Sequence, residues 1–315
     1  MKTRQGYTKL IPIGSLLLII ITTALLISLK TMTKDQEEKI AWDKNSEASI
    51  SLSSSNNESQ AEDESENPVQ LFRQASNKIP TDPSNTDLMT IQASIHDTIN
   101  HFYNNNFLTA QDDILKVIQQ NKLDVARTGI YFMPNHPAQV TQTDNIQQLD
   151  VPLLLQNDPR WAELHYGSDA PGQLYKNGCA IVSLAMIQAT YDNAQIEPQD
   201  ILDWSQDKYY LQNQGTSWDI FYDFAQEFGY QFENFGNDFD QAMAASQAGK
   251  LIVISVKPGT FTEIGHILIV RAYDPNQGLV YVNDPNDDPS KMHSLQGFDQ
   301  TIIQEDAVNY WAIYK

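Results

Sequence analysis

The pattern of apolar and polar positions divides the chain into four stretches. Residues 11–29 are uncharged and mostly Leu, Ile and Thr, whereas residues 30–84 are polar, acidic and rich in Ser and Asn. Apolar side chains then recur at helical spacing between residues 85 and 121, and from residue 149 they form compact runs separated by Gly, Pro and Asn. This order predicts a membrane segment, a linker, a small helical element and one folded domain.

The N-terminal apolar stretch is long enough to cross a bilayer, because about 20 apolar residues span its hydrocarbon core. Lys2, Arg4 and Lys9 precede it, so residues 1–10 are expected to stay in the cytoplasm and the rest to be translocated. No small-x-small cleavage site follows, which favours an uncleaved signal anchor at residues 11–29. We therefore expect a single-pass protein of the cell membrane with its C-terminal domain outside, or a secreted protein if the segment is cleaved.

Residues 30–84 bury too little apolar surface to offset their ordering entropy, so they are predicted to form a disordered linker. The next segment, residues 85–148, is predicted to contain a helical hairpin and a connector. Its two apolar stripes are separated by the break at residues 104–106. Three roles stay open for it: a stalk, a pro-region over the active site, or a docking surface. Packing onto the C-terminal domain is the default expectation.

Residues 149–315 are predicted to form one α+β domain. Helical patterns come first, around residues 179–191, 198–208, 217–228 and 239–248. Apolar strand patterns follow at residues 251–256, 266–273, 279–283 and 310–314. Helices followed by antiparallel strands indicate a helical layer packed on an antiparallel sheet.

Charge and cysteine content narrow the function. The chain has 20 Lys and Arg against 40 Asp and Glu, a net charge of -20, so no basic surface is expected to bind nucleic acid. A single cysteine excludes an internal disulfide. The sequence does not indicate an oligomeric state.

That cysteine, Cys179, begins an apolar helix directly after Gly178. A thiol in the first turn of a helix lies at the positive end of the macrodipole, near unpaired N–H groups, and both favour the thiolate. A nucleophile is one interpretation, and a small apolar residue filling the core is the other.

A histidine and an aspartate follow on two strands that a short turn connects. If residues 274–278 form that turn, Asp284 lies opposite residue 268, a diagonal cross-strand neighbour of His266. Cys, His and Asp in this arrangement predict nucleophile, base and orienting acid. His165 and His293 occur in polar loops and are interpreted as surface residues. Asp284, Asp287 and Asp288 lack the alternating ligand positions of a calcium loop, so a charged turn is expected there.

Several motifs in order resemble the cysteine peptidase family 39-like domain, whose best-known relatives trim double-glycine leaders from bacteriocin precursors. The resemblance covers about Leu149 to Lys315, and it implies a papain-like fold. It also implies that Cys179 is the nucleophile, His266 the general base and acid, Asp284 the orienting group and Gln156 the side-chain oxyanion donor. One departure is Gly178-Cys179-Ala180-Ile181, where many members have Gly-Cys-Gly-Pro. The motifs are Gln156-Asn157-Asp158-Pro159-Arg160-Trp161, Tyr166-Gly167, Asn177-Gly178-Cys179, Gly215-Thr216-Ser217-Trp218, Gly265-His266 and Val282-Asn283-Asp284-Pro285.

The sequence thus predicts a membrane-anchored extracytoplasmic cysteine peptidase or amidase of a bacterial cell surface. It would hydrolyse a peptide or cell-wall peptide through a thioacyl-enzyme, without a metal or cofactor. The main alternative is a catalytically inactive papain-like surface module that binds peptides or cell-wall fragments. A third reading keeps the chemistry and changes the substrate, as in a cell-wall amidase or an acyl transferase.

Overall fold

The computed structural model describes residues 67–137, 140, 146–168, 172–212 and 214–315. The predicted anchor at residues 11–29 and most of the predicted linker lie outside these residues. Among the helices of the described ranges, none combines the length and the apolar character that a bilayer crossing requires.

Four helices precede the C-terminal domain: α2 (Pro68–Ser76), α3 (Asn85–Tyr103), α4 (Phe107–Gln120) and α5 (Val125–Phe132). The predicted hairpin corresponds to α3 and α4. Asn104 ends α3 in the left-handed conformation, with a φ of 50°, which asparagine tolerates better than most residues.

The predicted disordered linker extended to residue 84, and this boundary is wrong, because α2 lies inside it. Asn67 caps α2 by accepting a hydrogen bond from the backbone N–H of Val69, and proline occupies the first turn, where its missing N–H costs nothing. Phe72 of this helix is fully buried. A single buried aromatic side chain anchors α2 within an otherwise polar stretch.

The four helices share a hydrophobic core with the segments that lead to the candidate active site. This core joins Phe72 and Ile114 to Leu155 and Met292 of the C-terminal domain. The Gln111 side-chain amide also donates a hydrogen bond to the Pro289 carbonyl oxygen, at 2.9 Å. The helical segment therefore packs onto the C-terminal domain, as the sequence predicted.

Replacing Phe72 by alanine is expected to destabilise the whole folded unit by about 3–5 kcal/mol, the usual cost of removing a buried phenyl ring. The described helical segment contains no tryptophan, whereas Trp161, Trp204 and Trp311 belong to the C-terminal domain. Tryptophan fluorescence in urea should therefore report the loss, although the mutation lies in a different segment. The matched control is Met89→Ala on exposed α3 surface. An unchanged fluorescence transition in Phe72→Ala would show that the two parts unfold independently.

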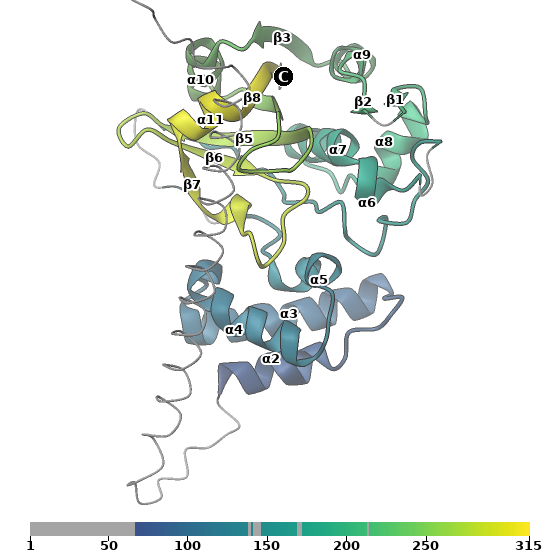
Figure 1. Ribbon diagram of the computed structural model, residues 1–315, viewed down its shortest axis with the longest axis vertical. Helices are drawn as coiled ribbons and strands as arrows, with labels where there is room; N and C mark the ends of the chain where they lie inside the picture. Colours follow the sequence, from purple (N-terminus) through teal and green to yellow (C-terminus); the bar gives the residue numbers. More distant parts are fainter. Residues whose placement is uncertain (1–66, 138–139, 141–145, 169–171, 213) are drawn as a thin grey trace, which may run out of the picture. The chain divides into compact units, whose positions relative to one another are not determined.

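The C-terminal domain is built on a six-stranded antiparallel sheet with the order β3-β8-β4-β5-β6-β7. Figure 1 shows the helix α7 (Cys179–Asp192) beside this sheet. A separate two-stranded ribbon pairs β1 (Tyr210–Leu211) with β2 (Gly215–Thr216). The strands of the large sheet are β3 (Gln231–Gly236), β4 (Leu251–Val256), β5 (His266–Asp274), β6 (Leu279–Asn283), β7 (Gly297–Asp299) and β8 (Ala307–Tyr314).

Both faces of the sheet are covered. On one face the core contains α7 (Cys179–Asp192), α8 (Pro198–Ser205) and α9 (Asp219–Phe228), with Leu251 and Val253 of β4. On the other, α10 (Phe239–Gln247) and α11 (Gln300–Asp306) pack against the alternate β4 residues Ile252 and Ile254. The expected helical layer is present, and the second face carries helices as well. The nearly continuous apolar run of β4, broken only by Ser255, is typical of a strand buried on both sides.

The β5–β6 hairpin brings its two candidate side chains to one end. Near the turn, Asp274 pairs with Leu279, one position out of the predicted register. An irregularity between Val270 and Ala272 then shifts the pairing, so that Ile269 lies opposite Asn283. Such a bulge adds one residue to one strand. The predicted register is thus restored at the end of the hairpin where His266 and Asp284 lie.

Candidate active site

Cys179 is the first residue of α7. The short helix α6 (Leu174–Asn177) ends at Gly178, whose backbone N–H donates to the Leu174 carbonyl oxygen at 2.7 Å. A Cβ atom on Gly178 would lie only 2.5 Å from that oxygen, so the close approach of α6 to α7 requires glycine. The Cys179 side chain is partly accessible. The thiol therefore lies in the first turn of α7, near backbone N–H groups that have no partner within the helix.

His266 is the first residue of β5 and is 7% exposed. Its Nε2 lies 2.7 Å from Asp284 Oδ1, and the Cys179 thiol lies within hydrogen-bond reach of the same ring. Burial alone would lower the pKa of His266, but the Asp284 carboxylate and the nearby thiol outweigh it and raise that pKa to about 10. The imidazolium form is therefore favoured in this position.

Asp284 is fully buried at the end of β6, where its carboxylate is held by three donors. Oδ1 accepts hydrogen bonds from His266 Nε2 and from the backbone N–H of Asn286 (2.7 Å), while Oδ2 accepts one from His293 Nδ1 (2.9 Å). Burial alone would raise the pKa of Asp284, but the two histidines hold it well below the usual range of a carboxyl.

His293 was predicted to be a surface residue, and this prediction is wrong. The residue begins the short 3₁₀ helix His293–Leu295, and its side chain is only 13% exposed. Its partner, Asp284, lies nine residues earlier, across an irregular loop that has no periodic pattern. His165 agrees with the prediction, since its side chain is 71% exposed and lies 3.3 Å from the Asp207 carboxylate.

Three of the loop's ligand-type side chains, Asp284, Asp287 and His293, come within 4.8 Å of one another. The buried Asp287 carboxylate accepts backbone N–H groups from His293 (3.0 Å) and Ser294 (2.7 Å). Burial and the neighbouring Asp284 raise the pKa of Asp287 to about 6. Backbone N–H groups and the two histidines thus donate to both buried carboxylates, which are hydrogen-bonded within the protein. The donor set fits a hydrogen-bonded charged turn.

Gln156 lies between the two segments that carry the sulfur and the carboxylate. Its backbone N–H donates to the Pro285 carbonyl oxygen at 2.7 Å, next to Asp284. Its side-chain Nε2 donates to the Tyr175 carbonyl oxygen at 2.6 Å, in the helix that precedes Cys179. An amide nitrogen carries two hydrogens, so a second N–H of the 5% exposed Gln156 side chain is left to donate elsewhere.

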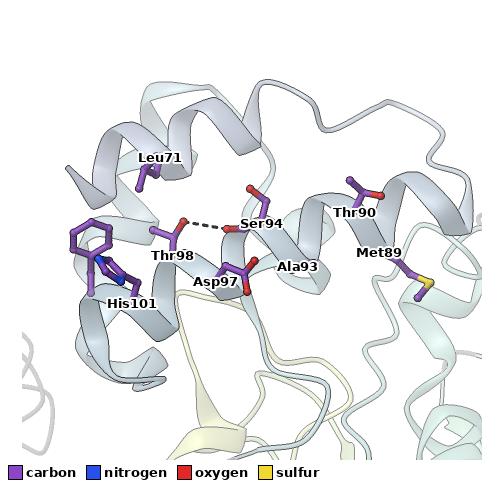
Figure 2. A pocket seen from close by; sticks show the side chains of 9 residues that line it. Leu71, Met89, Thr90, Ala93, Ser94, Asp97, Thr98 and His101 are labelled. Carbon is purple, nitrogen blue, oxygen red and sulfur yellow. Dashed lines mark hydrogen bonds between the residues drawn. The ribbon is translucent and has the colours of Figure 1, made fainter. Parts of the chain in front are cut away.

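A surface hollow in the helical segment contains none of these residues. Figure 2 shows it between α2 and α3, lined by Leu71, Met89, Asp97 and Thr98 among others. The Thr98 hydroxyl donates to the Ser94 carbonyl oxygen within α3, at 3.0 Å. The Cys179 thiol and the His266 imidazole lie elsewhere, where α7 meets β5.

Comparisons with known proteins identify a family for the C-terminal half of the chain. No curated protein matches the chain. Two solved structures are similar to it at 15% and 16% identity: the peptidase domain of ComA from Streptococcus, a bi-functional ABC transporter involved in a quorum sensing pathway, and a protein from Bacillus anthracis described as a C39-like peptidase. The matched regions span 49% and 54% of this chain and 98% of each of the two solved chains, and the TM-score is 0.35 in both cases. The model of the Peptidase_C39 like family matches residues 148–315. The chain therefore belongs to the Peptidase_C39 like family, and its C-terminal half is a cysteine peptidase-like domain.

Proposed function

We propose that the protein is a membrane-anchored, extracytoplasmic cysteine peptidase or amidase that cleaves a peptide or cell-wall peptide. One observation carries the proposal: a partly accessible sulfur at a helix start shares a buried imidazole with a fully buried carboxylate. A structural core has no need of this set of three groups, whereas thiol hydrolysis does.

In the proposed reaction Cys179 and His266 form a thiolate–imidazolium pair. The sulfur attacks the carbonyl carbon of the scissile bond, and the carbonyl oxygen takes the electron pair. As the tetrahedral intermediate collapses, the imidazolium gives its proton to the leaving amine and a thioester remains. His266 then removes a proton from water, which attacks the thioester and releases the acid. Asp284 keeps the imidazole oriented throughout.

The oxyanion would be held by two N–H donors, the Cys179 backbone and the Gln156 side chain. Replacing Gln156 by alanine is expected to lower kcat by about 10²-fold to 10³-fold, because one preorganised donor is lost. KM should change much less, since this donor acts on charge that develops in the transition state. Steady-state kinetics of the full-length chain test this. Gln199→Ala on α8, which pairs only with Asp203 on the same helix in the described structure, serves as control. A Gln156→Ala enzyme with parental kcat would remove the residue from the proposed site.

The proposed location rests on residues 11–29 and on the basic residues that precede them. The test is fractionation of cells that express the full-length chain. Protein in the membrane fraction, accessible to an added protease from outside, is the expected result. Protein recovered in the cytosol would reject the location without affecting the proposed chemistry.

The function itself is tested by incubating the full-length chain with double-glycine peptides and with cell-wall fragments, and by following products by mass spectrometry. Cleavage, with a covalent acyl adduct on Cys179 after rapid quenching, is the expected result. Binding of either ligand, with no product and no adduct, would instead indicate an inactive surface module.

A further inference from the structure

A second imidazole contacts the candidate orienting acid, and the reaction proposed above does not use it. His293 Nδ1 lies 2.9 Å from Asp284 Oδ2, while His266 Nε2 lies 2.7 Å from Oδ1. Each histidine thus contacts a different oxygen of one fully buried carboxylate. A carboxylate that accepts from both sides is fixed in one orientation.

The His293 ring is itself held in place. It meets the rings of Phe261 and Phe298 edge to face, with centroids 5.4 and 5.6 Å away. Its backbone N–H donates to Asp287 Oδ1 at 3.0 Å. Packing on both sides and a fixed backbone leave this imidazole little freedom to leave the carboxylate.

The next residue, Ser294, connects this loop to the sheet. Its hydroxyl accepts a hydrogen bond from the Asp284 backbone N–H at 3.0 Å, and its carbonyl oxygen accepts one from the buried Arg271 guanidinium, also at 3.0 Å. These two hydrogen bonds of Ser294 therefore hold the loop so that His293 lies against Asp284. Such support is typical of a residue whose orientation matters to a site.

We propose that His293 is a positioning residue of the active site, which occupies Asp284 Oδ2 so that Oδ1 alone serves His266. This inference rests on the proposed function. By donating to the carboxylate, His293 also withdraws negative charge from the His266–Asp284 pair, and so weakens the hold of Asp284 on the His266 proton. The ionisable groups around this pair are Cys179, Asp287 and, through the Ser294 carbonyl, Arg271.

Two variants of the full-length chain separate this role from simple loop support. His293→Leu removes the donor and keeps an apolar side chain between Phe261 and Phe298, whereas His293→Asn keeps an N–H near the position of Nδ1. The first measurement needs no substrate: the rate of Cys179 alkylation by iodoacetamide against pH, where the upper step reports loss of the His266 proton. The second is kcat and KM on a cleaved peptide.

In His293→Leu the upper step is expected to move to higher pH by about one unit, because the carboxylate then acts on His266 alone. Its kcat should fall about tenfold at unchanged KM, since the imidazolium gives up its proton less readily. His293→Asn should behave like the parent in both measurements. An unmoved upper step, a step that moves to lower pH, or equal losses in both variants would overturn the positioning role. A parent chain whose alkylation shows no imidazolium-linked step would instead reject the proposed function.

Discussion

Replacing Cys179 by alanine is expected to lower peptide hydrolysis by about 10⁴-fold or more, to the level that binding and oxyanion stabilisation alone provide. The sulfur forms the covalent bond of the proposed thioester, and no other cysteine is present in the 315 residues to replace it. Rates of product formation, measured with parent and variant at equal concentration, test this. The fold should be retained, because Cys179 is only partly buried at the start of its helix.

Two further variants of α7 make this test specific. Cys179→Ser keeps a hydroxyl nucleophile but is also expected to be inactive, because a hydroxyl does not ionise beside His266 as a thiol does. Thr190→Ala, near the far end of the same helix, should retain parental turnover. Its hydroxyl bonds only the Met186 carbonyl oxygen within the described structure. Turnover that persists undiminished in Cys179→Ala would end the thiol mechanism.

The second large effect is expected for Asp284→Asn, which keeps the shape of the side chain and removes its charge. Turnover should fall by about 10²-fold to 10⁴-fold, because the amide neither stabilises the imidazolium nor fixes its tautomer. The pKa of His266, about 10 with the carboxylate present, should fall, since Asp284 is the main group that raises it against the effect of burial. The upper step of Cys179 alkylation should therefore move to lower pH, the opposite direction to the His293→Leu variant.

The raised pKa of His266 also predicts how the stability of the folded protein depends on pH. A histidine whose pKa is raised by folding contributes stability that is present in full below its unfolded value of about 6.5 and is lost as pH rises through about 10.

Asp274→Asn is the matched control for Asp284→Asn, because Asp274 is also a buried aspartate but lies at the turn end of the same hairpin. It should leave turnover and the alkylation profile unchanged. An Asp284→Asn enzyme with parental turnover would remove this residue from the mechanism.

Much of the fold follows from local pattern. The strands β4, β5 and β6 are near-continuous runs of β-branched and aliphatic residues, and the buried helix α7 is mostly apolar. Their apolar sequences were therefore enough to predict them as buried elements. Elements of more polar sequence gave no such signal. The edge strand β3, with the sequence QFENFG, is mostly half-exposed, and α11 contains only two aliphatic residues. Their pairing and packing depend on neighbours that are distant in sequence.

The candidate site could likewise be predicted only in part from the sequence. That His266 and Asp284 lie at the same end of the hairpin was predictable from its turn, whereas their exact register also depends on the bulge between Val270 and Ala272. The Asp284–His293 pair was not predictable. An irregular loop brings the two residues together, and it is held by backbone N–H groups that donate to the Asp287 carboxylate and to the Ser294 hydroxyl. The α2 boundary was also missed, although its proline and its Asn67 cap were visible in the sequence.

The central claim is that His266 and Cys179 form an ion pair in the folded protein. The most direct measurement is the rate of Cys179 alkylation by iodoacetamide at pH 6, in the native full-length chain and in the same chain unfolded in urea. We predict much faster alkylation of the native chain, because a neighbouring imidazolium favours the reactive thiolate. Native alkylation as slow as, or slower than, that of the unfolded chain would contradict the account.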